Sequence, residues 1–135
     1  HTKQWQNTWI VAPDAGATKR CEKFAKQVRA KGVIQCIKTR DPATGALSGF
    51  KCLDDVAGKE LAIVDDICDA GGTFLGLRAE LADAAKVDLV VTHGIFSKGV
   101  NKVAQAFDNV YSALTYHEEA PEQVSNVFWQ PIGFN

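Results

Sequence analysis

The sequence predicts an α/β fold, a three-layer sandwich in which helices cover both faces of a central, mostly parallel five-stranded sheet. Short apolar runs alternate along the chain with segments whose apolar residues recur at helical spacing. One run, 61–64, is continuously apolar, which is typical of a parallel strand buried on both faces. Strands that alternate with helices join through right-handed βαβ units and so form a parallel sheet.

The first half of the chain supplies two predicted strands and one helix. An apolar run at 9–12 indicates a strand that ends in a turn. Apolar residues at 17, 21, 24, 25 and 28 form one helical stripe, and we expect Gly32 to end this helix. A second strand follows at 33–37. Residues 38–49 are polar and broken by Pro and Gly, so we expect a mobile loop.

The second half supplies three more strands, at 61–64, 87–93 and 110–114. Helical spacing predicts one helix from about 72 to 85 and another with apolar residues at 100, 103, 104 and 107. The tail from 118 to 135 carries Phe128, Trp129, Ile132 and Phe134. We expect these large apolar side chains to pack on the body of the protein or on a partner chain.

Composition and length bound the function classes. At 135 residues the chain is expected to be a single domain, 1–135. A net charge of −1 argues against nucleic acid as a partner. The absence of a long apolar run and of a signal peptide argues against a membrane partner. The sequence begins at His1 and contains no Met, so we expect residues upstream of it.

Four cysteines, at 21, 36, 52 and 68, contain no C-x-x-C pair, which argues against a zinc site. Their near-even spacing also permits a disulfide interpretation. Three of them lie in apolar periodic segments, where a free Cys behaves as a small buried hydrophobe. We therefore expect free thiols in a reduced, cytoplasmic protein.

The unusual polar clusters all follow predicted strands. Because the carboxyl ends of parallel strands share one edge of the sheet, these turns are expected to meet there. The clusters are Asp14-Ala15-Gly16, Lys38 with Arg40, Asp65-Asp66 with 69–73, and 93–97.

The segment Asp69-Ala70-Gly71-Gly72-Thr73 opens a predicted helix. Backbone N–H groups at a helix start suit a phosphate group, although simple helix capping is the alternative. The adjacent carboxylates of Asp65 and Asp66 suit neutral ribose hydroxyls or a bridging Mg²⁺. Phosphate and hydroxyl sites side by side predict a sugar phosphate ligand.

Three further clusters have an interpretation that fits phosphoryl transfer. Asp14-Ala15-Gly16 is either an ordinary Asp-containing turn or a second anion and metal site. Lys38 and Arg40 are either a solvated surface pair or mobile cations that close over a transferring phosphoryl group. His93 and Ser97 either end a strand and cap a helix or add a secondary phosphate contact.

The run from Val64 to Thr73 resembles the phosphoribosyl pyrophosphate motif of type I phosphoribosyltransferase folds. Three other segments resemble ribose-phosphate pyrophosphokinases in particular: 12–16 with Lys19-Arg20, 38–40, and 92–97. They occur in that family's order over roughly 9–114. The chain matches only the C-terminal of the two domains in those enzymes.

The resemblance implies a role for each matching residue. Residues 69–73 would hold the 5-phosphate of ribose 5-phosphate, and Asp65 and Asp66 would contact its 2- and 3-hydroxyls. Asp14 would help to place Mg²⁺ and the β,γ-diphosphate of ATP, with Ala15 and Gly16 in the same loop. Lys38 and Arg40 would be catalytic. The implied reaction forms phosphoribosyl pyrophosphate and AMP from MgATP and ribose 5-phosphate.

Two residues depart from the family pattern: Ala70 stands at a usual Thr and Lys98 at a usual Gly. The family's adenine-binding and Asp-Leu-His segments are absent, so we expect the chain to act with a partner domain or as a homo-oligomer. Two alternatives remain open. One is a stand-alone phosphoribosyltransferase that uses phosphoribosyl pyrophosphate, and the other is a non-catalytic sugar-phosphate-binding regulatory subunit.

Overall fold

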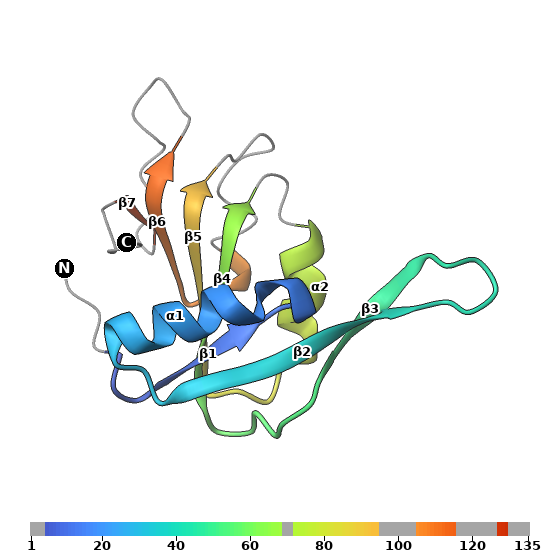
Figure 1. Cartoon of the computed structure of the whole chain (residues 1–135), viewed down its shortest axis with the longest axis horizontal. Coiled ribbons are helices and arrows are strands. Elements are labelled where there is room, and N and C mark those ends of the chain that lie inside the picture. The colour runs from blue at the N-terminus through green and yellow to red at the C-terminus, as the bar shows by residue number, and fades with distance from the viewer. Residues whose placement is uncertain (1–4, 69–71, 95–104, 116–126, 130–135) are drawn as a thin grey trace.

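A computed structural model of the chain describes residues 5–68, 72–94, 105–115 and 127–129. They form one sheet in the order β3-β2-β1-β4-β5-β6-β7 (Figure 1). All neighbouring strands are parallel except the antiparallel pair β2 and β3. The strands are β1 (Thr8–Ala12), β2 (Gly32–Arg40), β3 (Leu47–Cys52), β4 (Glu60–Cys68), β5 (Lys86–Gly94), β6 (Asn109–Thr115) and β7 (Val127–Trp129). The helices are α1 (Thr18–Val28), α2 (Gly72–Glu80) and the short 3-10 turn η1 (Ala15–Ala17).

The predicted α/β sandwich and its mostly parallel sheet are confirmed. The five predicted strands are β1, β2, β4, β5 and β6, and the structure adds β3 and β7 at the two edges. The residues of β7 pair with β6, so the backbone of this part of the predicted apolar tail joins the sheet. The rest of the tail lies outside the described residues.

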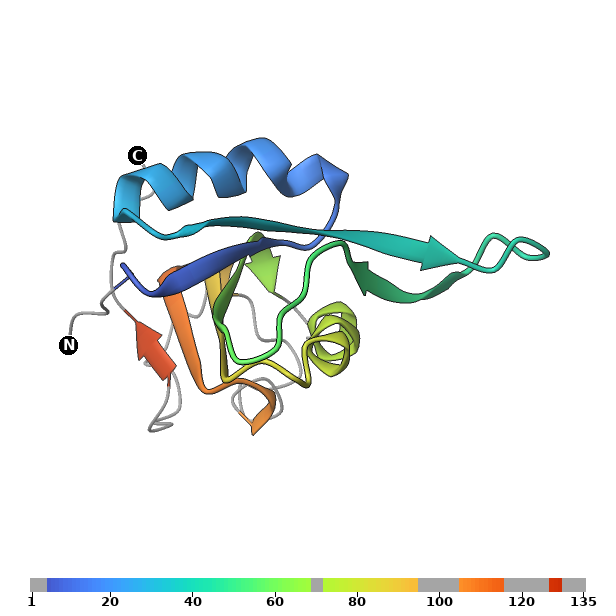
Figure 2. The ribbon, with the colours of Figure 1, turned by 90° about the horizontal axis from the view of Figure 1, so that it is seen from below.

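The prediction of a loop over 38–49 was wrong at both ends of this range, and only 41–46 form a turn. Lys38 to Arg40 continue β2, and β3 pairs with it as a hairpin that projects from the body as an arm (Figures 1 and 2). The turn between the two strands places Gly45 at φ 73°, a left-handed conformation that favours glycine. The sequence of the arm resembles that of a loop because its outer residues are exposed and mostly polar, which leaves no apolar pattern to indicate a strand.

Helices α1 and α2 cover opposite faces of the sheet (Figure 2). Helix α1 joins β1 to β2, whereas α2 joins β4 to β5, and these two crossovers run toward opposite edges of the sheet. Since both crossovers are parallel βαβ units, the usual right-handed connection places their helices on opposite faces.

Each face has its own apolar core. On the α1 side, Ile10 of β1 packs in one buried cluster with Phe24, while Val11 packs with Leu77 of α2 in the other. This alternation along one strand explains why the central strands are apolar at every position. Burial on both faces fixes the pairing of β1 with β4, because a slip of one residue would exchange the two cores.

The helix boundaries differ from the prediction. Helix α1 ends at Val28, and Arg29 adopts a left-handed φ of 59° while its N–H bonds back to α1 carbonyls. Gly32 instead begins β2, where an added Cβ would lie 3.0 Å from the Trp9 ring. Helix α2 stops at Glu80, short of the predicted 85. Most of the predicted helix after β5 lies outside the described residues. Within the described ranges no helix is long and apolar enough to span a membrane.

Candidate functional site

The carboxyl ends of β1 and β4 form a topological switch point. The chain leaves β1 toward β2 on one side and leaves β4 toward β5 on the other, so the connections diverge between these two neighbouring strands. Ligands of open α/β sheets bind in the crevice that such a divergence leaves at the carboxyl ends. Asp14 follows β1, and Asp65 lies near the end of β4, so both predicted carboxylates flank this point.

Asp14 is held by the short turn that follows β1. Its Oδ1 accepts a hydrogen bond from the Ala17 N–H at 3.1 Å and so caps η1. A Cβ added to Gly16 would lie 3.3 Å from the same oxygen, closer than ordinary van der Waals contact. The Asp14-Ala15-Gly16 turn therefore presents a fixed carboxylate at the switch point, with no side chain on Gly16 to crowd it.

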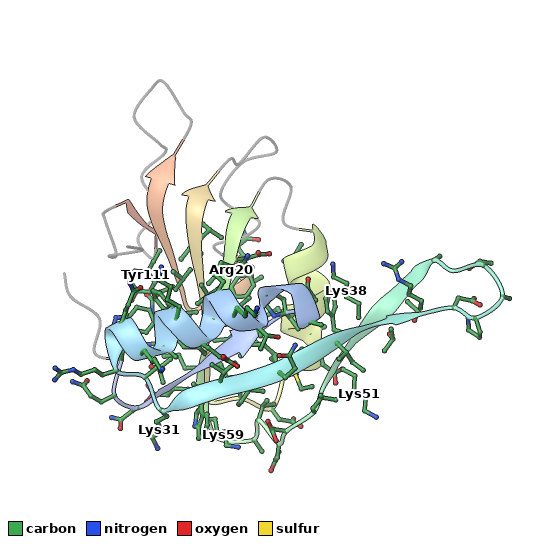
Figure 3. All side chains as sticks on the ribbon, in the orientation of Figure 1. Arg20, Lys31, Lys38, Lys51, Lys59 and Tyr111 are labelled. Atoms are coloured by element: carbon green, nitrogen blue, oxygen red, sulfur yellow. The ribbon has the colours of Figure 1, made fainter. Side chains whose placement is uncertain are left out.

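Lys38 of β2 reaches this carboxylate. Its Nζ lies 3.3 Å from Asp14 Oδ2, and both side chains are about a third exposed. Figure 3 shows Lys38 where β2 passes the start of α1 and enters the arm. The structure thus brings together two predicted site residues, Asp14 from the turn after β1 and Lys38 from the neighbouring strand β2.

A second ion pair crosses the same point. Arg20 of α1 extends to β4, where its Nη2 donates to Asp65 Oδ1 at 2.6 Å (Figure 3). Asp65 lies two residues beyond Ile63, the partner of Val11 in β1, so it stands just past the end of β1. Arg20 therefore bridges over that strand end to the neighbouring strand.

Both ion pairs are partly exposed, with side-chain exposures of 30–36%. Pairs of this kind contribute at most about 1 kcal/mol to folding, because water screens them. The two pairs therefore orient Lys38 and Arg20 at the switch point without being a large source of stability.

The predicted phosphate loop is described only at its ends. Strand β4 is longer than predicted and runs to Cys68, so Asp65 and Asp66 belong to the strand itself. Helix α2 begins at Gly72, as the phosphate-loop prediction requires. The structure gives the backbone of Asp66, Gly72 and Thr73. Asp69, Ala70 and Gly71 lie outside the described residues.

Arg40 is placed away from the switch point. It ends β2 on the arm, where its Nη1 donates to the Gly45 carbonyl at 3.2 Å. The sequence predicts that Lys38 and Arg40 act as one pair of cations. In the structure their side chains have different partners, Asp14 for Lys38 and the Gly45 carbonyl for Arg40. A β-bulge between Thr39 and Arg40 changes the register of the arm at this point. His93 lies in β5, and Ser97 lies outside the described residues.

Asp14 and Asp65 are the carboxylates at the switch point whose side chains the structure describes, and Asp14 is the one predicted to hold a metal ion. No group of three or more His, Cys, Asp or Glu that could hold a metal occurs within the ranges that the structure describes. Mg²⁺ keeps several waters and is commonly bound by one or two carboxylates plus substrate phosphates. Asp14 therefore fits a Mg²⁺ ion delivered on a phosphate ligand and does not by itself form a metal cage.

The site residues predicted from the sequence omit Arg20, although Lys19-Arg20 belongs to one of the segments that carry the family resemblance. The helical pattern places Arg20 on the polar face of α1. Its neighbours one turn away, Ala17 and Phe24, are buried, so the position lies at the border of the apolar stripe. Arg20 lies in the first turn of α1, and α1 starts at the edge of the sheet where the carboxyl ends of the strands meet. A position at the border of the apolar stripe there is a further signal that could have identified it.

No protein-family model matches the chain. A curated relative, the ribose-phosphate pyrophosphokinase of Cereibacter sphaeroides (strain KD131 / KCTC 12085), is 34% identical over 96 residues. That match covers 70% of this chain and 28% of the relative. A second, from Mycoplasmopsis pulmonis (strain UAB CTIP), is 36% identical over 92 residues, covering 67% and 29% respectively. The chain thus spans under a third of the length of these relatives.

Among solved structures, phosphoribosylpyrophosphate synthetase from Mycobacterium smegmatis superposes with a TM-score of 0.72 at 26% identity. The superposition covers 90% of this chain and 40% of the synthetase chain. APRTase from Giardia lamblia superposes with a TM-score of 0.66 at 19% identity, over 82% of this chain and 71% of that one, which supports the fold alone. The predicted resemblance in fold and sequence is confirmed.

Proposed function

We propose that the chain, a sequence relative of ribose-phosphate pyrophosphokinases with a phosphoribosyltransferase-type fold, is the ribose 5-phosphate-binding catalytic domain of such an enzyme. The proposed reaction transfers diphosphate from MgATP to ribose 5-phosphate and yields phosphoribosyl pyrophosphate and AMP. One observation carries the proposal: two carboxylate–cation pairs, Asp14 with Lys38 and Asp65 with Arg20, meet at the switch point between β1 and β4.

Ribose 5-phosphate would bind at the end of β4. In the proposal, the backbone N–H groups of 69–73 hold the 5-phosphate at the start of α2. Asp65 and Asp66 accept hydrogen bonds from the 2- and 3-hydroxyls. Ala70 provides no hydroxyl, so the phosphate would depend more on backbone donors and on Thr73. The position of the α2 start directly after β4 supports this arrangement.

The diphosphoryl group would lie over Asp14 and Lys38. The oxygen of the ribose 1-hydroxyl loses its proton and forms a bond to the β-phosphorus of ATP. The bond between that phosphorus and the oxygen that it shares with the α-phosphorus breaks, and AMP leaves. Charge spreads over the phosphoryl oxygens in the transition state, so fixed cations lower the barrier. Lys38 is already at the switch point, and Arg40 would join it by a movement of the arm.

Mg²⁺ would accompany ATP as its phosphate complex, with Asp14 as the protein ligand and Ala15 and Gly16 leaving space beside it. The ion would neutralise phosphate charge. Asp14 would hold the ion, and it also orients the Lys38 ammonium, which lies 3.3 Å from Asp14 Oδ2 and would face the phosphoryl oxygens. The chain's own contribution is therefore to orient one carboxylate and one cation.

The two alternatives make different demands on the chain. A stand-alone phosphoribosyltransferase must contact a base as well as phosphoribosyl pyrophosphate. A non-catalytic sugar-phosphate-binding subunit needs no cation beside the diphosphate position, so the Lys38–Asp14 pair favours a catalytic role. In the proposal the enzyme is cytoplasmic and acts as a homo-oligomer or with a further domain that completes the ATP site.

Titration calorimetry with four ligands tests the proposal. We expect ribose 5-phosphate to bind, 2-deoxyribose 5-phosphate to bind several-fold more weakly, inorganic phosphate to bind more weakly still, and ribose not to bind. The deoxy compound lacks the hydroxyl assigned to the two aspartates and keeps the phosphate. Equal affinity for inorganic phosphate and ribose 5-phosphate would reduce the site to an unspecific anion site and overturn the proposal.

An activity assay separates the role of this domain from that of the complete enzyme. Because the chain spans under a third of the relatives' length, we expect negligible AMP formation from MgATP and ribose 5-phosphate by the chain alone. Rapid AMP formation that depends on ribose 5-phosphate would contradict the division into an acceptor site here and an ATP site elsewhere.

A further inference from the structure

Two cysteines lie directly opposite each other at the base of the arm. Cys36 of β2 is the register partner of Cys52 of β3. The Leu53 N–H donates to the Gln35 carbonyl at 3.0 Å, which makes Gln35 and Leu53 a hydrogen-bonded pair of the antiparallel ladder. The next pair along, Cys36 and Cys52, is therefore a non-hydrogen-bonded pair, in which the Cα atoms and side chains approach most closely.

The two sulfur atoms face each other. Cys36 Sγ and Cys52 Sγ lie 2.6 Å apart, and both thiols are free in this structure. The Cα separation typical of a non-hydrogen-bonded pair, about 4.5 Å, falls within the range that a disulfide spans. The register and the facing sulfur atoms therefore suit a cross-strand disulfide.

The two thiols differ in reactivity. Cys36 is fully buried, whereas Cys52 is partly exposed at the edge strand. The hydrogen bond between the two thiols lowers the pKa of Cys52 and raises the pKa of Cys36, which burial raises further. Nearby Glu80 and Asp54 oppose both ionisations. Cys52, which is partly exposed and has the lower pKa of the two, is thus the thiol that meets a reagent first, and Cys36 is placed to resolve the product.

We propose that Cys36 and Cys52 are a redox modification site, which a low-molecular-weight disulfide converts reversibly into a cross-strand disulfide at the base of the β2–β3 arm. The Cys52 thiolate attacks one sulfur of oxidised glutathione and releases one glutathione thiolate. Cys36 then attacks Cys52 Sγ in the mixed disulfide, releases the second glutathione and gives its proton to that leaving thiolate. Two electrons pass from the cysteine pair to the glutathione disulfide.

The bond would change the arm. Lys38 lies two residues beyond Cys36 on the same strand, and Arg40 four residues beyond, so both predicted cations lie on the segment that the disulfide would close. A covalent link would hold the register of β2 against β3 where the arm leaves the body (Figure 1). The modification itself does not depend on the proposed function.

Mass spectrometry of the intact chain tests the proposal. After incubation with oxidised glutathione and blocking of the remaining thiols, we expect peptide mapping to show a Cys36–Cys52 link that dithiothreitol reverses. The Cys36→Ser variant should instead accumulate a glutathione adduct on Cys52, and Cys21→Ser should still form the link. Hydrogen exchange on the wild type, which needs no variant, should show several-fold slower exchange of the 38–49 amides after oxidation.

Three results would overturn the proposal. They are a stable glutathione adduct on wild-type Cys52 with no link, a link that involves Cys21 or Cys68, and unmodified cysteines at glutathione concentrations that oxidise a dithiol peptide of the same spacing. Unchanged exchange of the arm in the linked form would remove the proposed effect on the arm.

Discussion

Arg20 Nη2 and Asp65 Oδ1 lie 2.6 Å apart, although the residues are separated by 45 positions in the sequence. The contact joins the first turn of α1 to the end of β4, across the end of β1. It places a guanidinium beside a strand-end carboxylate at the point where the sheet's connections diverge. A cation held there is suited to receive a phosphate oxygen, and we therefore propose that Arg20 contacts the phosphate ligand.

Arg20→Ala is expected to change function more than stability. Because the pair is about a third exposed, its loss should lower the free energy of unfolding by no more than about 1 kcal/mol. Affinity for ribose 5-phosphate should fall about tenfold, the cost of one charge-assisted hydrogen bond. Urea denaturation and titration calorimetry measure the two effects. Lys23→Ala, an exposed change one turn further along α1, is the control. A loss of several kcal/mol with unchanged affinity would make Arg20 structural only.

Lys38→Ala is expected to weaken diphosphate binding. Its ammonium lies 3.3 Å from Asp14 Oδ2, beside the position proposed for the diphosphoryl group. Affinity for inorganic diphosphate should fall by about tenfold, again the value of one charged contact. Lys51→Ala removes an exposed lysine from the neighbouring strand β3 and should have no effect (Figure 3). Equal losses in the two variants would show that only the overall charge of the arm matters.

Gly76→Ala is expected to stabilise the protein. Gly76 lies inside α2, and an added Cβ would meet the Phe50 ring at 3.6 Å, an ordinary contact. Alanine lowers the conformational entropy of the unfolded chain and has a higher helix propensity than glycine. The free energy of unfolding should therefore rise by about 0.5–1 kcal/mol. Gly58→Ala is the matched test, since φ is +71° there and a side chain is strained. That variant should be less stable. Thermal denaturation that ranks the two in the opposite order would contradict these backbone assignments.

Tyr111 makes the protein sensitive to alkali. Burial, and then the nearby Asp88, raise the pKa of Tyr111 to about 12 from its ordinary 10. A raised pKa in the folded state means that the unfolded chain loses this proton first. Stability is therefore complete below pH 10 and falls by on the order of 2 kcal/mol between pH 10 and 12. In Tyr111→Phe this fall should be smaller by that amount. Parallel stability–pH curves for the two proteins would contradict the assignment.

The sequence predicts the parts of this fold whose burial is complete. Val11 and Ile63 pack on one face of the sheet and Ile10 and Ala62 on the other, and such two-sided burial requires the continuous apolar runs that reveal β1 and β4. The arm gives no such signal, because its outer residues have no core to face. Its strand β3 is specified by pairing with β2, which no periodicity records.

The sequence likewise predicts some parts of the candidate site and not others. Turn chemistry and strand order place Asp14, Asp65 and Lys38 at one edge before any coordinates are known, and the structure brings all three to the switch point. The pairing of Arg20 with Asp65 depends on how far one long side chain reaches across a strand end. The meeting of Cys36 with Cys52 depends on a register that only the hairpin geometry determines.

The central claim is that this switch point binds a ribose phosphate through Asp65 and Asp66. Titration calorimetry of ribose 5-phosphate against the wild type and the Asp65→Asn, Asp66→Asn double variant tests it most directly. Asp83→Asn, an exposed carboxylate change before β5 at the opposite end of the sheet, is the control. We predict an affinity loss of tenfold or more in the double variant and none in the control. Equal affinity in all three proteins would contradict the assignment of the ribose hydroxyls to these carboxylates.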